Sequence, residues 1–166
     1  MKLRETLHLP LSAGAAADMY ADPRYAQVRR QTLRASSAES ALEGDPAGAF
    51  TVRTTLMMPT DRVPDIVRPF VGSSVTIREE QAWSAAAADG SRTGTMTLDV
   101  VGTPAGMTAA LRLSPTEQGS RVEIDGDLVA KVPLLGARLE KAAMPYVSTV
   151  LRAEERSAAT YQAQSE

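Results

Sequence analysis

The sequence contains no cysteine and no asparagine, and it has one histidine, one tryptophan and two phenylalanines. Without cysteine, the chain has no disulfide, no thiolate metal site and no cysteine nucleophile. The single histidine, His8, falls on the outward side of an alternating segment. A metal site would therefore need carboxylates alone, and their spacing matches no such motif. We expect neither a metal nor a cofactor.

Long apolar runs and an excess of one charge are also missing. No apolar run approaches the roughly 18 residues that indicate a membrane span. Arg4 and Glu5 interrupt the start of the chain, where a signal peptide needs an unbroken apolar stretch, so none is expected. The net charge is −2 without any block of like charges, which argues against nucleic acid as a partner. These absences predict a cytoplasmic protein with no transmembrane segment, and they leave the oligomeric state open.

The rest of the composition is that of a globular protein. Hydrophobic residues make up 43% of the 166 residues and charged residues 23%. This length fits one domain that can bury a sizeable core, so we expect a single domain over residues 1–166. Neither a Gly-x-Ser-x-Gly elbow nor a phosphate-binding loop is present in the sequence.

Most of the chain before residue 133 alternates between apolar and polar residues, which is the pattern of half-buried strands. The expected strands are residues 2–9, 36–43, 50–58, 75–83, 93–101, 107–113 and 121–132. Two short helices are expected over 13–20 and 24–33, after Ser12 and the Asp22-Pro23 pair. Residues 59–69 are expected to form a connector with a helical turn, and Gly126 predicts a bulge or sharp curvature.

The last part of the chain has helical periodicity over residues 135–162. Its apolar stripe includes Leu139, Val147 and Leu151, and Pro145 inside it predicts a kink. The face with Arg152, Glu154, Glu155 and Arg156 is expected to lie in solvent. Because a sheet with one apolar face needs a cover, we expect an α+β fold. In it, a curved antiparallel sheet of about six or seven strands wraps around this helix.

This order of elements resembles the helix-grip fold of the START-like superfamily, also called SRPBCC. The superfamily includes polyketide cyclases, birch-pollen-allergen-like proteins and lipid-transfer domains. Local segments resemble a mainly actinobacterial branch, a domain of unknown function: 93–95 (TGT), 119–121 (GSR), and 131–136 (KVPLLG) leading into 138–141 (RLEK). The resemblance covers essentially the whole chain. It implies a cavity for an apolar ligand between sheet and helix, and it implies no particular reaction.

The inward faces of the expected strands either fill a core or line a ligand pocket. Seven methionines beside only two phenylalanines favour adaptable, apolar pocket walls. The predicted ligand-binding residues are Met19, Tyr20, Phe50, Val52, Thr54, Leu56, Phe70, Ile77, Glu79, Gln81, Trp83, Met96, Leu98, Met107, Leu111, Leu128, Met144 and Val147. A close-packed core remains the alternative, since protein interiors normally leave few voids.

Polar residues on these inward faces are the most informative positions. Glu79 and Gln81 share a side with Val75, Ile77 and Trp83. A carboxylate there has to be paired, hydrated or functional, because burying it unpaired is costly. Glu79 is therefore the one weak candidate for a catalytic acid or base. The alternatives are that Glu79 lies in water near a strand end, or that the alternation is assigned one residue out of phase, so that Glu79 faces outward.

Three functions remain open at this point. The first is a binding module for a small hydrophobic molecule of the lipid, polyketide or isoprenoid class. The second is an enzyme of cyclase, dehydratase or aromatase type that uses Glu79, Gln81 or Tyr20 in the same cavity. The third is an interaction or stress-accessory protein without a ligand. The binding module is the first choice, which makes enzymatic activity uncertain and a small apolar molecule the expected partner.

Overall fold

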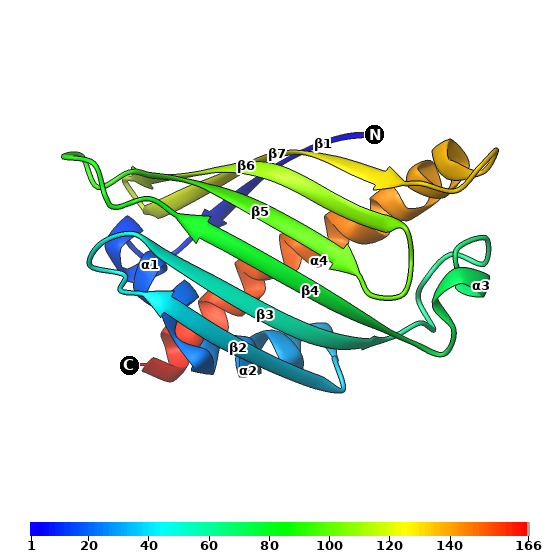
Figure 1. Cartoon of the computed structure of the whole chain (residues 1–166). Coiled ribbons are helices and arrows are strands. Elements are labelled where there is room, and N and C mark those ends of the chain that lie inside the picture. Colours follow the sequence, from blue (N-terminus) through cyan, green and yellow to red (C-terminus); the bar gives the residue numbers. More distant parts are fainter. Residues whose placement is uncertain (166) are drawn as a thin grey trace.

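A computed structural model describes residues 1–165, and its elements follow the expected order (Figure 1). The elements are β1 (Lys2–Leu9), α1 (Ala13–Ala21), α2 (Pro23–Leu33), β2 (Ser37–Gly44), β3 (Phe50–Pro59), α3 (Arg68–Val71), β4 (Ser74–Trp83), β5 (Arg92–Val100), β6 (Ala105–Thr116), β7 (Gly119–Ala130) and α4 (Gly136–Ser165). This confirms the α+β class, the two short helices after the first strand and the long C-terminal helix.

The seven strands form one antiparallel sheet in the order β1-β7-β6-β5-β4-β3-β2. The pairing passes through Gly126 without interruption, since Gly126 pairs with Leu3 on one side and with Ala109 on the other. Of the two alternatives predicted for Gly126, a bulge or sharp curvature, the bulge is therefore wrong. A Cβ atom at this position would lie 2.6 Å from the Thr108 carbonyl oxygen and 2.8 Å from the Ala109 Cβ. Glycine thus allows β6 and β7 to approach closely in the curved sheet.

Alternation places one apolar side of each strand against the helices. In β4, residues Val75, Ile77, Glu79, Gln81 and Trp83 are all buried, and their neighbours in the strand are more exposed. The assigned side of this strand is therefore correct, and Glu79 does not lie in water. β7 ends at Ala130, two residues earlier than predicted, while β6 is longer than predicted at both ends.

The side chains of Ser12 and Asp22 begin the two short helices. Ser12 Oγ accepts a hydrogen bond from the Ala15 backbone N–H, and Asp22 Oδ1 accepts one from the Arg24 backbone N–H. Pro23 follows Asp22 at the first helical position, where its missing N–H is tolerated. Both N-caps agree with the sequence analysis.

Helix α4 crosses the inner face of the sheet and spans about 45 Å at 1.5 Å per residue (Figure 1). The helix continues through Pro145, whose ring is exposed. A kink at this position stays a prediction. Burial is uneven along the helix. Leu139 is the only buried residue of α4 before Leu151, whereas five of the eight residues from Leu151 to Ala158, about two turns, are buried. The first half of α4 therefore covers a less densely filled space.

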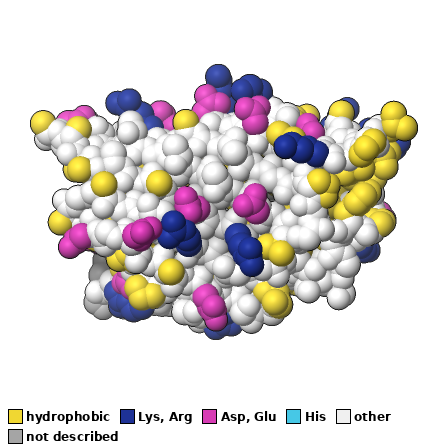
Figure 2. All heavy atoms as spheres, in the orientation of Figure 1, with side chains coloured by type: hydrophobic (Ala, Val, Ile, Leu, Met, Phe, Trp, Pro, Cys, Tyr) yellow, Lys and Arg dark blue, Asp and Glu magenta, His cyan; other side chains and the backbone are white. Residues whose placement is uncertain are grey.

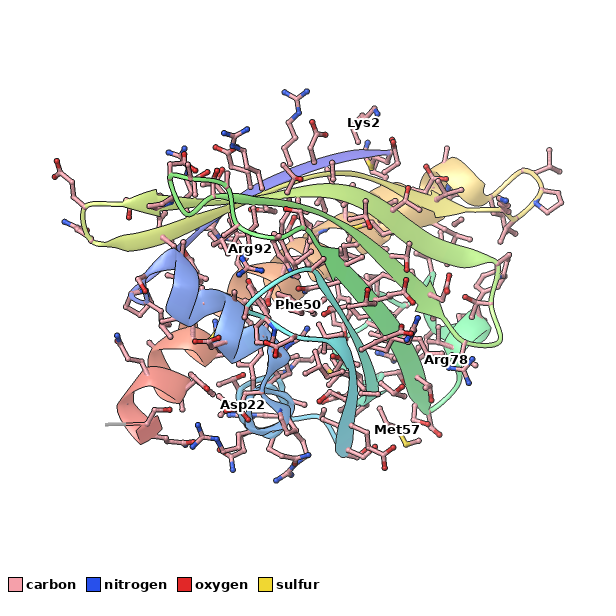
Figure 3. The ribbon with its side chains drawn as sticks, turned by 60° about the vertical axis from the view of Figure 1, so that its left-hand side comes forward. Lys2, Asp22, Phe50, Met57, Arg78 and Arg92 are labelled. Atoms are coloured by element: carbon pink, nitrogen blue, oxygen red, sulfur yellow. The ribbon has the colours of Figure 1, made fainter. Side chains whose placement is uncertain are left out.

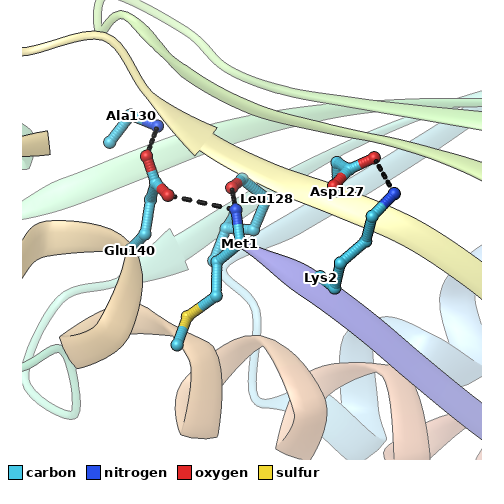
Figure 4. Close-up of polar contacts among 6 residues, drawn as sticks. All are labelled: Met1, Lys2, Asp127, Leu128, Ala130 and Glu140. Carbon is cyan, nitrogen blue, oxygen red and sulfur yellow. Dashed lines mark hydrogen bonds and ion pairs between the residues drawn. The ribbon is translucent and has the colours of Figure 1, made fainter. Parts of the chain in front are cut away.

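The start of α4 is anchored to the edge of the sheet (Figure 4). Glu140 Oε2 accepts a hydrogen bond of 3.1 Å from the Ala130 backbone N–H, and Glu140 Oε1 lies 3.1 Å from the Met1 ammonium nitrogen. The same ammonium donates to the Leu128 carbonyl oxygen at 2.7 Å. The Ala130 N–H, together with the ammonium group, lowers the pKa of the Glu140 carboxyl. These contacts fix where the helix leaves the sheet.

The main core lies under α1 and the second half of α4. Tyr20 stacks on Trp83 with ring centroids 5.7 Å apart, and Met19, Leu113 and Ile124 are almost fully buried beside them. Figure 3 shows Arg92, at the start of β5, beside Phe50, at the start of β3. The Arg92 guanidinium carbon lies 5.6 Å from the centroid of the Phe50 ring. A smaller cluster around Leu56, Met58 and Ile77 lies toward the opposite end. No helix within residues 1–165 is both long and apolar enough to span a membrane.

Candidate functional site

A cavity of about 140 Å³ lies between the inner face of the sheet and the first half of α4. Strands β3 to β7 form one wall, residues 139–151 of α4 form the opposite wall, and residues 63–71 close one side. This volume far exceeds the roughly 10–15 Å³ that one water molecule requires. The chain thus leaves a void where its long helix is least buried.

The predicted ligand-binding residues fall into two groups in the structure. One group lines the cavity: Leu56, Phe70, Ile77, Glu79, Leu98, Met107, Leu128 and Val147. The other group lies outside the lining, mostly in the core toward α1: Met19, Tyr20, Phe50, Val52, Thr54, Gln81, Trp83, Met96, Leu111 and Met144. The sheet's inner face is therefore divided between a packed end and a hollow end.

Further lining residues were not among the predicted ligand-binding residues, although Val75 and the stripe residues Leu139 and Leu151 were expected on apolar sides of their elements. They are chiefly Met58, Val63, Pro64, Val67, Val71, Val75, Val100, Val132, Leu139, Ala143, Tyr146, Val150 and Leu151. Residues 63–71 form only the short helix α3, four residues long, and carry no clear period. The alternation of β3 and β4 could have indicated Met58 and Val75, but the closing segment could not be placed from its own sequence.

Three charged residues line the cavity, Arg29, Glu79 and Glu140, and the first two bind one another. Arg29 of α2 donates hydrogen bonds of 3.0 and 3.1 Å to the two carboxylate oxygens of Glu79 on β4. Both side chains are only 4% exposed. Burial lowers the pKa of the Arg29 guanidinium, but the Glu79 and Glu154 carboxylates outweigh burial and raise it above its ordinary value. Arg29 therefore stays charged, and the pair presents little free charge to the cavity.

The Arg29–Glu79 pair continues into a short polar chain along β4. The Gln81 amide donates to Glu79 Oε1 at 3.0 Å, and the Trp83 indole N–H donates to Gln81 Oε1 at 3.0 Å. Because each of these buried donors meets an acceptor, the inward polar residues of β4 are satisfied by one another and by Arg29. Hydrogen bonds thus hold the floor of the cavity to the stacked rings of Tyr20 and Trp83.

A second buried carboxyl lies beside this chain, on α4. Glu154 is 2% exposed and accepts a hydrogen bond of 3.1 Å from the Tyr25 hydroxyl. Burial raises the pKa of Glu154 to about 7, with Arg29 opposing the rise and Glu79 adding to it. Burial and the Glu154 carboxylate likewise raise the pKa of Tyr25. The prediction that Glu154 lies in solvent is wrong, because α2 packs against this side of α4.

Sequence reasoning also missed Arg29, which lies on the buried side of α2 with Tyr25 and Val28. The spacing of Tyr25, Arg29 and Thr32 places all three on one side of the helix. Thr32 and Ser157 hydroxyls meet at 2.5 Å and join this side of α2 to α4. Arg29 lies four residues after Tyr25 and three after Ala26, so helical spacing could have indicated that Arg29, and not Arg30, faces the core.

Apolar side chains are exposed around the hollow end of the molecule. Figure 2 shows hydrophobic side chains gathered at the end where α3 and the start of α4 lie. Phe70, which lines the cavity, is 39% exposed, and Leu134 at the loop before α4 is 102% exposed with a φ of 66°. The cavity therefore lies next to an apolar outer rim.

Solved structures share this arrangement of sheet and helix at low sequence identity. The protein TTHA0849 from Thermus thermophilus is 15% identical with a TM-score of 0.62, and the match covers 97% of this chain and 99% of that one. The Zhui aromatase/cyclase from Streptomyces sp. R1128 is 13% identical with a TM-score of 0.60, covering 95% and 90%. The STAR-related lipid transfer protein from Xanthomonas axonopodis is 15% identical with a TM-score of 0.51, covering 93% and 85%.

These matches, with the curved sheet that holds the long helix, show a START-like fold. Residues 4–161 match the family described as "Protein of unknown function (DUF2505)", and the chain belongs to that family. No curated protein matches the sequence.

Proposed function

We propose that the protein binds a small hydrophobic molecule of the lipid, polyketide or isoprenoid class, with its apolar part in the cavity under α4. The observation that carries this proposal is the chemistry of the lining. Apolar side chains form nearly all of it, the Glu79 carboxylate already accepts hydrogen bonds from Arg29, and Glu140, its third charged residue, accepts hydrogen bonds from the Ala130 N–H and the Met1 ammonium. Such a cavity favours apolar matter, because each Å² of apolar surface removed from water contributes about 25 cal/mol.

The size of the cavity supports a small guest or the apolar part of a larger one. A dry apolar cavity of about 150 Å³ holds a molecule the size of benzene. The half-buried residues of α4 above the void could move apart around something longer, since they are less buried than Leu151 to Ala158. The names of two similar structures, an aromatase/cyclase and a lipid transfer protein, agree with hydrophobic ligands for this fold.

Native mass spectrometry of the protein purified from its own host tests this proposal. We expect an added mass that disappears on denaturation. The variant Ala143→Trp, which fills the cavity, should lose the added mass, whereas Ala159→Trp on the exposed side of the same helix should keep it. A ligand-free protein that also fails to bind octanol would contradict the proposal, as would an unchanged ligand in Ala143→Trp.

An enzyme acting in the same cavity is less well supported. Glu79, its best residue, accepts two hydrogen bonds from Arg29 and one from Gln81. A carboxylate held in this way is poorly suited to deliver or remove a proton. Tyr20 and Gln81, the other two residues proposed for catalysis, lie outside the lining. Binding is therefore the function that the site favours.

A further inference from the structure

A second hollow lies on the outer side of α4, next to the cavity. It has a volume of about 510 Å³ and runs between the end of α2, residues 58–64 and α4. Unlike the cavity, it is lined by several polar and charged side chains. Three of these are arginines that come from three separate segments: Arg34 after α2, Arg62 in the connector and Arg156 in α4.

The three arginines give this groove a positive excess in a protein whose net charge is −2. Across residues 1–165, no carboxylate lies within 4.0 Å of any of the three guanidinium groups, although Asp61 also lines the groove. Other exposed arginines of the chain do form ion pairs, as Arg53 does with Glu43 and Glu80. Guanidinium groups with free donors bind carboxylate and phosphate oxygens well.

One layer of side chains separates the groove from the cavity. Met58, Pro64, Tyr146 and Val150 line both spaces. Met58 is unbranched and adapts easily to a neighbour, and residues Tyr146 and Val150 belong to the half-buried part of α4. Burial raises the pKa of the Tyr146 hydroxyl, with Asp61 adding to this and Arg62 opposing it, so the phenol remains a neutral hydrogen-bond donor.

We propose that the groove binds the anionic head of an amphiphile, a carboxylate or phosphate, whose apolar part occupies the cavity. This inference rests on the proposed function. A charged head inside the cavity would have to be buried beside the Glu79 carboxylate, which already accepts from both Nη groups of Arg29 and leaves only the Arg29 Nε–H without a partner. In the groove the head keeps contact with water and can bind the guanidinium groups of Arg34, Arg62 and Arg156. The apolar tail of the ligand then passes between Met58 and Tyr146 into the cavity.

Calorimetric titration with octanoate, octyl phosphate and octanol tests the inference, because the three probes share one chain and differ in the head. We expect the wild-type protein to bind one or both anionic probes about tenfold more tightly than octanol, which corresponds to about 1.4 kcal/mol. In the triple variant Arg34→Gln, Arg62→Gln and Arg156→Gln this preference should vanish, with octanol binding unchanged. The comparison of octanoate with octyl phosphate identifies which head the groove prefers.

The matched control removes the same charge from exposed arginines on three strands: Arg4→Gln, Arg78→Gln and Arg112→Gln. It should keep the preference. Salt should weaken octanoate binding to the wild-type protein more than octanol binding, which checks the charge contribution without any variant. Octanol binding with no anionic preference overturns this inference alone, as does equal loss of preference in both triple variants. Failure of all three probes to bind overturns the proposed function as well.

Discussion

Arg29 and Glu79 form a two-bond ion pair that joins helix α2 to strand β4 at the floor of the cavity. The residues are 50 positions apart in the sequence, and neither side chain is more than 4% exposed. A buried pair of this kind stabilises little by itself, because removing both charges from water costs about as much as their attraction returns. Replacing only one of the two residues, however, leaves the other charge buried without its partner.

The variant Glu79→Gln should therefore destabilise the protein strongly. Arg29 would remain charged and buried, which typically costs about 3–5 kcal/mol, with the low end expected here because Glu154 lies near enough to compensate in part. Urea unfolding measures this loss. Glu80→Gln, which changes the exposed neighbour that pairs with Arg53, should cost under about 1 kcal/mol. Equal effects of the two variants would contradict the burial of the pair.

Replacing both partners should restore much of the stability. The double variant Arg29→Met and Glu79→Leu removes both charges and fills the space with apolar groups of similar length. We expect it to unfold at a urea concentration close to that of the wild type and clearly above that of Glu79→Gln. Should the double variant be less stable than the single one, the two charges would not act as a pair, and the network through Gln81 would carry the stability instead.

Glu154 predicts a pH dependence of stability near neutrality. Its pKa is about 7 in the folded protein against an ordinary value of 4.5. The folded state thus binds the Glu154 proton more tightly than the unfolded state does. The stabilising contribution of this carboxyl to the free energy of unfolding is therefore fully present below about pH 4.5. It is lost as pH rises through about 7, with a slope of at most about 1.4 kcal/mol per pH unit. The charged and titratable groups around it are Tyr20, Tyr25, Arg29 and Glu79.

The measurement compares unfolding of the wild type with Glu154→Gln between pH 5 and 8, in steps of about one unit. The glutamine keeps an acceptor for the Tyr25 hydroxyl, and the difference in stability should shift in favour of the variant as pH rises. Glu117→Gln, in the exposed hairpin before β7, should run parallel to the wild type. A parallel curve for Glu154→Gln would show that this carboxyl does not titrate near neutrality.

Gly126 should tolerate no side chain. In Gly126→Ala the new Cβ would lie 2.6 Å from the Thr108 carbonyl oxygen, a backbone atom that cannot move without shifting β6. We expect a loss of about 1–3 kcal/mol in thermal or urea unfolding. Gly48→Ala is the matched control, because its Cβ would meet nothing nearer than 3.9 Å. An unchanged stability in Gly126→Ala would mean that β6 and β7 are further apart than the structure places them.

The order of elements could be predicted from the sequence because most strands have one clear apolar side. In β4 the alternation of Val75, Ile77 and Trp83 was regular enough to place Glu79 and Gln81 inward despite their polarity. The helix caps at Ser12 and Asp22 followed from local chemistry alone. Strand ends were less certain, since β7 ends at Ala130 for reasons of pairing that no single residue in 131–132 reveals.

The site was harder to predict because it depends on contacts between distant segments. Arg29 and Glu154 are polar residues on amphipathic helices, and apolar periodicity assigns such residues to solvent. Each is buried together with a partner from a distant segment: Arg29 binds Glu79 on β4, and Glu154 accepts a hydrogen bond from Tyr25 on α2. Likewise the inward residues of the sheet have one pattern throughout, and nothing in that pattern separates Trp83 in the packed end from Ile77 in the hollow end.

The central claim, a hydrophobic ligand under the first half of α4, is tested most directly by methyl NMR during titration with octanol. The account predicts shifts and intermolecular contacts at Leu98, Leu139 and Val147, which line the cavity. It predicts little change at Leu7 and Leu113 in the packed core, and loss of the contacts in Ala143→Trp. Shifts confined to exposed residues such as Leu42 and Leu134, with none at the lining, would contradict it.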